Sequence, residues 1–478
     1  MTGAPADADR VYLLRPSVPP ASVRAPAIWF AVLAAGVSAI ALVDPTAAAV
    51  VAFFGVGLLV AALHPGLVAP YLVLATPLGY WHPQIAGVQM PVLEMAALGA
   101  ALGCVPRAVA GGGSGDRLTG ADIAFAALVG GVVLSGAGSP PRSAWAHNVV
   151  FWSSLAVVFW ATHRAMHRRC FRTTFVFGIG VAAFAEAVVA IVQYIQGSSG
   201  RFSRLGGAIV YPQPQGTLGN PNALAPYLVV GLLLLAGAAL AEPPRRRNAI
   251  FAVATVVGIG SLVPFSRGGW ISLAAGLLVW SGAQRRARRL LATIAILGSL
   301  LGAALVFGGA FGARLSSLVS RHFSDLYGFR LTLADRAAHI VAHHPLTGTG
   351  VFREFGTYAG RPSLATHPHD LLLGVAVFFG IPAALAFLAL LVLAVRGALR
   401  AVTSGSATLR AEGAGAIAVL AVYVVDGFLE YPFWNDSLTV LAVAVLAYSV
   451  ALGESSRGDP RTAVPATADE PSRRERLQ

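Results

Sequence analysis

Long apolar runs recur along most of the chain, and they restrict its fold more than any other feature. An α-helix crosses a bilayer with about 20 apolar residues, and runs near this length alternate with short polar breaks between residues 28 and 452. Of the 478 residues, 56% are hydrophobic and only 12% are charged, whereas about 25% of a soluble domain is charged. The sequence therefore predicts an all-α polytopic membrane protein.

The boundaries of the apolar runs predict about 12 to 14 transmembrane helices. The segment near 67–80 is short and interrupted by prolines, so it could instead be re-entrant or interfacial. The candidate spans lie near residues 28–43, 46–63, 67–80, 86–105, 121–137, 147–163, 172–195, 222–241, 248–264, 269–283, 289–311, 371–396, 411–428 and 436–452.

Arginine-rich loops predict the orientation, because short loops rich in basic residues stay in the cytoplasm. Such clusters lie at 163–172, 242–247, 284–289 and 396–410. The alternate loops, 196–221, 265–268, 312–370 and 429–435, are then expected to face outward. With an even number of spans, both termini of this multi-pass protein are expected to lie in the cytoplasm.

This orientation divides the chain into five parts, with the longest outward segment as the natural place for a functional site. The parts are a cytoplasmic N-terminal tail at 1–27, a transmembrane helical domain at 28–311, an extracytoplasmic loop at 312–370, C-terminal transmembrane helices at 371–452, and a polar cytoplasmic tail at 453–478 that is expected to be disordered.

The positive charge of the chain does not indicate a nucleic-acid partner. All 34 basic residues are arginines and the net charge is +13, but the arginines are divided among short loops instead of forming one soluble patch. The two cysteines, Cys104 and Cys170, are far apart and have no CxxC spacing. The sequence therefore supports neither a disulfide framework nor a thiolate metal site.

Several arginines fall in the outward loops, where the preference for basic residues in the cytoplasm disfavours them. An arginine deep in a bilayer costs about 2.5–3.5 kcal/mol, so it normally faces a cavity, a partner or the interface. For Arg267, snorkelling to the headgroups and binding of a phosphate through its N–H fork both remain open. The outward arginines are Arg201, Arg204, Arg267, Arg314, Arg321, Arg330, Arg336, Arg353 and Arg361.

The stretch THPHD at 366–370 places His367, His369 and Asp370 directly before a long apolar run. Local chemistry leaves three interpretations open. The histidines and the aspartate could bind one metal ion, since residues i and i+2 share a face when extended. One imidazole could act as an acid or base, oriented by a carboxylate or carbonyl. The group could also be the polar rim of a membrane helix.

Three further segments contain polar residues whose position in the sequence indicates a specific role. Asn222, in a Gly-flanked Asn-Pro-Asn turn, is expected to cap the next helix or to help its N-terminus accept an anion. The spacing of apolar residues predicts an amphipathic helix over 331–344, lying on the outer surface. Asp426 lies within an apolar span, where a carboxylate usually faces the interior and finds a partner, such as an outward arginine.

Taken in order, these segments resemble the bacterial O-antigen ligase and O-antigen polymerase superfamily. The resemblance extends over roughly residues 170–450. It consists of G-T-x-G-N-x-N at 216–222, S-R-G at 266–268, Arg330 ahead of H-P-L-x-G-x-G at 344–350, and a histidine followed by a polar residue, leucines and G-I-P at 380–382. Each motif is short, but their order and shared outward side make the resemblance fairly specific.

The resemblance implies a membrane glycosyltransferase that moves a glycan from a polyprenyl diphosphate to an acceptor hydroxyl of a lipid core or a growing polysaccharide. It implies that 312–370 is a catalytic loop and that the histidine of the family is His369. The expected partners are the lipid-linked donor, a glycan or lipid acceptor and membrane lipids, with no metal, cofactor or nucleic acid. Chemistry then assigns His369 as the base, Arg267, Arg330 and Arg336 to the pyrophosphate, and Asn220, Asn222, Asp370 and Asp426 as supporting residues.

Two positions depart from the family pattern. Ala334 stands where an aromatic residue is often found, and Phe378 replaces an acidic residue before G-I-P, which removes one candidate partner for His369. Ligase and polymerase are not distinguished, and transfer to a protein hydroxyl would use the same groups. A lipid-linked glycan flippase or transporter is the alternative of another class, although such a protein should show internal repeats and charges at mid-membrane.

Overall fold

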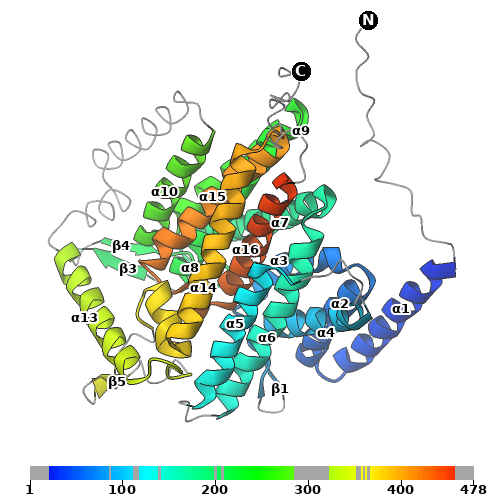
Figure 1. Ribbon diagram of the computed structural model, residues 1–478, viewed down its shortest axis with the longest axis horizontal. Helices are drawn as coiled ribbons and strands as arrows, with labels where there is room; N and C mark the ends of the chain where they lie inside the picture. The colour runs from blue at the N-terminus through cyan, green and yellow to red at the C-terminus, as the bar shows by residue number, and fades with distance from the viewer. Residues whose placement is uncertain are drawn as a thin grey trace, which may run out of the picture.

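The computed structural model describes residues 21–85, 88–110, 118–137, 142–198, 202–205, 209–284, 322–350, 357–358, 361–362 and 367–457. Across these residues the chain forms a bundle of packed α-helices, joined by short turns and three two-stranded hairpins (Figure 1). The predicted all-α polytopic architecture is confirmed.

The helices follow the apolar runs closely. Their bounds are α1 (Ala21–Ala41), α2 (Pro45–Leu63), α3 (Val68–Ala75), α4 (Val92–Ala110), α5 (Gly120–Leu134), α6 (Arg142–Ala165), α7 (Arg169–Gln196), α8 (Pro221–Ala241), α9 (Pro244–Leu262), α10 (Arg267–Ala283), α13 (His322–His343), α14 (Leu371–Thr403), α15 (Ala407–Gly427) and α16 (Asp436–Arg457). The antiparallel hairpins pair β1 (Gln84–Ile85) with β2 (Val88–Gln89), β3 (Phe202–Leu205) with β4 (Ile209–Pro212), and β5 (Thr357–Tyr358) with β6 (Arg361–Pro362).

Every predicted span within the described residues coincides with a helix, and the predicted span 289–311 lies outside them. Among the described residues, eight helices are long and apolar enough to cross a membrane, namely α2, α5 together with the turn that continues it to Ala137, α6, α7, α8, α14, α15 and α16. The predicted number of 12 to 14 is larger, because some predicted spans form helices that are short or carry several arginines. Helix α10 has 17 residues, and the first turn of α9 contains Arg245, Arg246 and Arg247.

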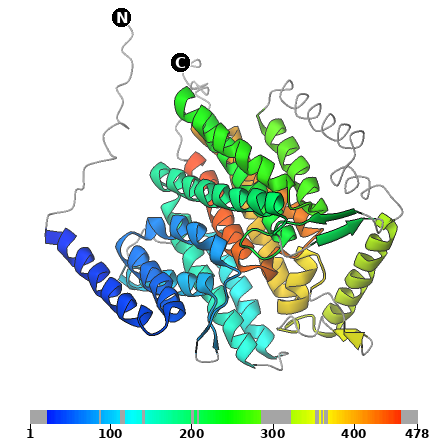
Figure 2. The same ribbon diagram turned by 180° about the vertical axis from the view of Figure 1, so that it is seen from behind.

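Helices α16 and α8 form the centre of the bundle. In the apolar window of α16, 94% of the residues are buried, and in that of α8 83%, against 33% for α2. Helices α14, α15 and α6 pack around α16, while the N-terminal α1 and α2 lie on one flank and α13 on the opposite one (Figures 1 and 2). Helices α8 and α16 thus form the buried interior against which the helices that carry the site residues pack.

The predicted amphipathic helix is present as α13, which ends close to the expected residue but begins earlier, at His322. Its apolar face packs on α14, with Leu333 and Ala337 buried and Ile340 and Val341 partly buried. This packing brings the side of α13 close to the beginning of α14.

The motif at 344–350 docks on the kink in α14. The backbone N–H groups of Thr349 and Gly350 donate to the carbonyls of Val377 and Phe378, and the N–H of Ile381 donates to the carbonyl of Pro345, each at 2.8 Å. The kink lies at Gly380, with φ 86° and ψ 166°, a conformation open essentially only to glycine. The H-P-L-x-G-x-G and G-I-P motifs are therefore two halves of one contact.

Candidate active site

A cavity of about 390 Å³ opens where α8, α10 and α14 begin and α15 ends, with α13 along its side. It brings together six of the residues singled out in the sequence, although they come from five helices and their connecting turns. These six are Asn222, Arg267, Arg330, His369, Asp370 and Asp426.

Glu430 orients the imidazole of His369. Nδ1 of His369 lies 2.6 Å from Oε1 of Glu430, and Glu430 is only 6% exposed. A carboxylate this close to Nδ1 favours the tautomer that has its proton on Nδ1. Nε2 of His369 then carries the lone pair, and His369 itself lines the cavity. An imidazole held by a carboxylate in this way can act as a general base.

His367 supports this pair from the buried side. Its Nδ1 accepts the backbone N–H of His369 at 3.3 Å, and its Nε2 lies 3.4 Å from Oε1 of Glu430. The ring stacks on Trp434, with centroids 5.6 Å apart. Burial lowers the pKa of His367 to about 4, so this imidazole is neutral at physiological pH.

The backbone at His369 is itself constrained. Its φ of 54° lies in the left-handed region, which is uncommon for a non-glycine residue. The next residue, Asp370, is the N-cap of α14, and its carboxylate accepts the N–H of Leu373 at 2.8 Å. Asp370 therefore sets the start of the helix, while the orientation of His369 comes from Glu430 and His367.

A hydrogen-bond chain links Glu430 to two earlier motifs. Asn222 donates through Nδ2 to Oε2 of Glu430 at 3.3 Å and accepts the hydroxyl of Ser266 at 3.1 Å. The Ser266 oxygen in turn accepts the N–H of Gly269 and caps α10. The G-T-x-G-N-x-N and S-R-G segments thus meet at the carboxylate that holds His369.

The ionisation of Glu430 follows from these contacts. Burial acts to raise the pKa of its carboxyl, but the hydrogen bond from His369 and the positive charges nearby, including Arg330, outweigh it and lower the pKa. Glu430 is therefore a carboxylate at neutral pH, as an acceptor for two imidazoles must be.

Two arginines line the same cavity. Arg267 is the first residue of α10, directly after the Ser266 cap, and Arg330 projects from α13. Burial lowers the pKa of Arg330, against the opposing charges of Glu430 and Asp426, but guanidinium stays charged in proteins. Nη1 of Arg330 is buried and has no hydrogen-bond partner among the described residues. Such a donor is suited to an anionic ligand.

The other predicted residues lie beside the cavity. Asn220, not Asn222, is the N-cap of α8, since its side chain accepts the N–H of Asn222 at 2.8 Å. The expectation that Asn222 caps this helix is wrong, because Asn222 lies one position inside it and points at Glu430. Arg336 is buried within α13, at 6% exposed, and does not line the cavity.

Metal ligation at this site is geometrically possible. One ligand atom from each of His367, His369 and Glu430 lies within 4.8 Å of the others. His367 already uses Nδ1 to accept a backbone N–H, so it could offer only Nε2. The same three groups therefore serve either as a hydrogen-bonded base or as a set of metal ligands.

Glu430 is the residue that sequence reasoning did not assign to the site. It lies among aromatic residues near the end of a span, a position typical of the membrane interface. One sequence signal did point to a carboxylate from elsewhere. Phe378 replaces the acidic residue often found before G-I-P, so His369 lacked a nearby carboxylate partner. Only the fold shows that the carboxylate comes from the turn after α15.

Comparison with known proteins agrees with this geometry. Residues 250–388 match the family model described as O-Antigen ligase, and this segment contains Arg267, Arg330, His369 and both halves of the α14 contact. A search of curated proteins gives no significant match. The segment 250–388 is thus similar to the O-antigen ligase family, and this similarity supports a function of the ligase or polymerase type.

Proposed function

We propose that the protein transfers a glycan from a polyprenyl diphosphate to an acceptor hydroxyl on the outer face of the bacterial plasma membrane, with both termini in the cytoplasm. The observation that supports this most is the presence of the Glu430–His369 pair in one cavity with Arg267 and Arg330. A base and two fixed cations are the groups that such a displacement needs.

In the proposed reaction, Nε2 of His369 removes the proton of the acceptor hydroxyl as its oxygen attacks the anomeric carbon. The bond from that carbon to the diphosphate oxygen breaks, and the polyprenyl diphosphate leaves with the electron pair. Arg267 and Arg330 bind the anionic leaving group. Glu430 stabilises the imidazolium that forms on His369. A single displacement of this kind inverts the anomeric centre, and its chemistry requires no metal or cofactor.

The apolar part of the cavity fits a lipid carrier. Leu331, Phe428 and Ile271 line it and yet are 56%, 66% and 39% exposed. Exposed apolar side chains beside two arginines suit an amphiphile whose anionic head enters the cavity while its chain remains in the bilayer. This supports a diphosphate attached to a long hydrocarbon over a soluble sugar nucleotide.

Transfer assays with a lipid-linked glycan in membranes test the proposal. His369→Ala should lower the rate by about 10²–10⁴-fold, the usual contribution of a general base, and Arg267→Ala should abolish transfer at normal protein level. His343→Ala and Arg246→Ala are matched controls, because both side chains are exposed and neither lines the cavity. Full activity of His369→Ala would remove this residue from the mechanism.

Gene deletion distinguishes the ligase from the polymerase. Loss of a ligase should leave full-length glycan unattached to its acceptor, whereas loss of a polymerase should leave single repeat units. The alternative is a transporter. If membranes from the deletion strain still transfer the glycan to its acceptor, but the glycan no longer reaches the outer face of intact cells, the activity is transport and the proposed chemistry is wrong.

A further inference from the structure

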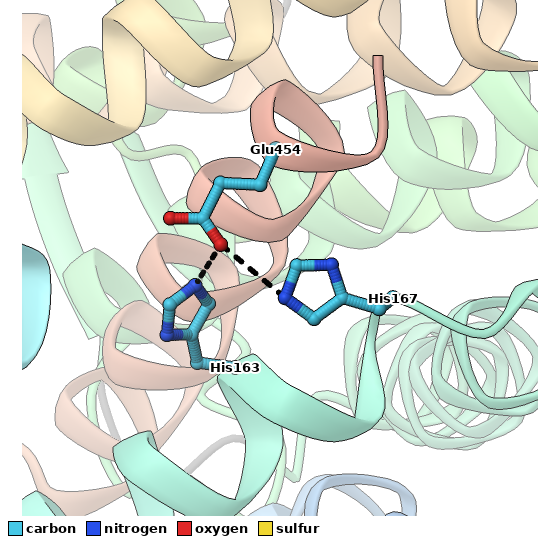
Figure 3. A group of neighbouring side chains, drawn as sticks. All are labelled: His163, His167 and Glu454. Atoms are coloured by element: carbon cyan, nitrogen blue, oxygen red, sulfur yellow. Dashed lines mark hydrogen bonds and ion pairs between the residues drawn. The ribbon is translucent and has the colours of Figure 1, made fainter. Parts of the chain in front are cut away.

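A second cluster of titratable residues lies at the other end of the bundle. Helix α16 begins beside the candidate active site and ends at Arg457, with Glu454 in its last turn. His163 is in the last turn of α6, and His167 follows in the turn to α7. Figure 3 shows both imidazoles pointing at the Glu454 carboxylate. The proposed transfer reaction uses none of these residues.

Three ligand atoms converge in this cluster. Nε2 of His163 lies 3.0 Å from Oε2 of Glu454, and Nε2 of His167 lies 3.2 Å from the same oxygen. One ligand atom from each residue lies within 4.8 Å of the others. Zinc bound at about 2.0–2.1 Å in a tetrahedral site holds its ligand atoms about 3.3–3.4 Å apart. The two nitrogen-to-oxygen distances, 3.0 and 3.2 Å, differ from this spacing by only a few tenths of an ångström.

Asp122 provides an outer partner for His163. Its Oδ1 lies 3.5 Å from Nδ1 of His163, the position from which a carboxylate commonly orients a metal-bound imidazole. The Asp122 carboxylate is itself fixed, because it accepts the N–H and hydroxyl of Thr119 at 2.8 and 3.0 Å and pairs with Arg164 at 3.3 Å.

A cation between His163 and Glu454 would stabilise one tautomer of His163 in particular. When the proton of a neutral His163 is on Nδ1, toward Asp122, the lone pair of Nε2 faces a carboxylate oxygen at 3.0 Å. Two acceptors at this distance repel unless a second proton or a metal ion lies between them. His167 presents another imidazole nitrogen to the same oxygen, so a metal ion would satisfy all three ligands at once.

Solvent can reach the open side of the cluster. The side chain of His163 is 1% exposed, whereas those of His167 and Glu454 are 40% and 30% exposed. A metal ion could therefore enter past His167, and water could complete a fourth coordination position. The buried His163 would anchor the ion against the bundle.

We propose that His163, His167 and Glu454 form a zinc site, with water as the fourth ligand, that joins the end of α6 to the last turn of α16. Two imidazoles and one carboxylate form a ligand set that suits zinc among the divalent ions. The site is separate from the candidate active site, and it would connect two helices that are far apart in the sequence.

Metal binding by the full-length protein in detergent tests this proposal. After chelation and removal of the chelator, the protein should bind about one equivalent of added Zn²⁺, and Co²⁺ should give the visible bands of a tetrahedral site. His167→Ala and the near-isosteric Glu454→Gln should each lose this equivalent. Asp122→Asn should weaken binding by about 10–100-fold, as loss of an outer partner does.

Two controls separate this site from the rest of the molecule. His64→Ala removes an exposed histidine at the same end of the bundle and should keep the bound metal. His369→Ala should also keep it. Loss of metal in His369→Ala with retention in Glu454→Gln would place the ion at the candidate active site and overturn the proposal. Absence of saturable Zn²⁺ or Co²⁺ binding by folded protein would overturn it as well, leaving a protonated ion-pair cluster.

Discussion

Glu430 determines the state of both histidines around it. One of its oxygens faces Nδ1 of His369 at 2.6 Å and Nε2 of His367 at 3.4 Å, while the other accepts from Asn222. A single buried carboxylate thus contacts two imidazoles that are two residues apart, through Nδ1 of one and Nε2 of the other. His369 presents its free nitrogen to the cavity, and His367 is a neutral buried support.

Replacing the carboxylate should therefore impair the chemical step. Glu430→Gln keeps the size of the side chain but removes the negative charge that fixes Nδ1–H of His369 and stabilises the imidazolium. We expect kcat to fall by at least about 10²-fold with little change in the KM for the lipid-linked donor. Steady-state kinetics check this, and a rise in KM at unchanged kcat would show that Glu430 acts on binding instead.

His367 should make the stability of the protein depend on pH. Its pKa is lowered by burial to about 4, from about 6.5 in the unfolded chain. As pH falls from 6.5 toward 4, the unfolded chain gains a proton that the folded protein does not, so the free energy of unfolding decreases by up to about 3 kcal/mol.

His367→Asn should flatten this dependence, since asparagine offers an acceptor for the N–H of His369 but does not titrate. Thermal midpoints in detergent at pH 7 and pH 5 measure the difference, and His64→Asn, at an exposed histidine, is the control. An equal pH dependence in wild type and His367→Asn would contradict this assignment.

At the level of elements, the site depends on helix ends. Asn220, Ser266 and Asp370 cap α8, α10 and α14. A polar residue within two positions of each cap lines the cavity, namely Asn222, Arg267 and His369. Sequence patterns located these helices well, because apolar runs and Asn, Ser and Asp caps are local signals. They indicated Asn222 instead of Asn220 as the cap of α8, since both residues are asparagines beside the same turn and either could cap the helix.

The contact between 344–350 and the α14 kink should be sensitive to a single methyl group. A Cβ at Gly380 would lie 2.3 Å from the carbonyl oxygen of Leu346, and the backbone conformation there costs other residues about 1–3 kcal/mol. Gly380→Ala should therefore lower the thermal midpoint and reduce activity by displacing α13 and Arg330.

Gly130→Ala provides the comparison. Gly130 is within α5, and nothing lies within 4 Å of the Cβ position, so alanine should be neutral or slightly stabilising in that helix. If Gly380→Ala is as stable as Gly130→Ala, the docked contact is not needed for the fold.

At the level of the whole molecule, the polar residues divide between two ends of an apolar bundle. The candidate active site occupies one end, and the arginine-rich turns together with His163, His167 and Glu454 occupy the other. Charge patterning predicted this division from loop composition alone. It could not predict that residues more than two hundred positions apart, such as Asn222 and Glu430, share one hydrogen bond, because nothing local in either segment encodes the packing of α8 beside α15.

Labelling of a native cysteine tests the orientation. Cys170 is exposed in the first turn of α7, on the end expected to face the cytoplasm. A membrane-impermeant maleimide should leave it unmodified in intact cells and modify it after lysis. His343→Cys in a Cys170→Ser background should react in intact cells. Modification of Cys170 without lysis would reverse the orientation.

The order of the site residues along the chain has a consequence for biosynthesis. Asn222 and Ser266 emerge from the ribosome first, His369 follows, and Glu430 comes only shortly before α16. Because insertion proceeds from the N-terminus, a nascent chain that already contains the arginines and His369 still lacks the carboxylate that orients this histidine. Under the proposed mechanism, we expect the assembling protein to be inactive toward lipid-linked glycans until its last helices have entered the bilayer.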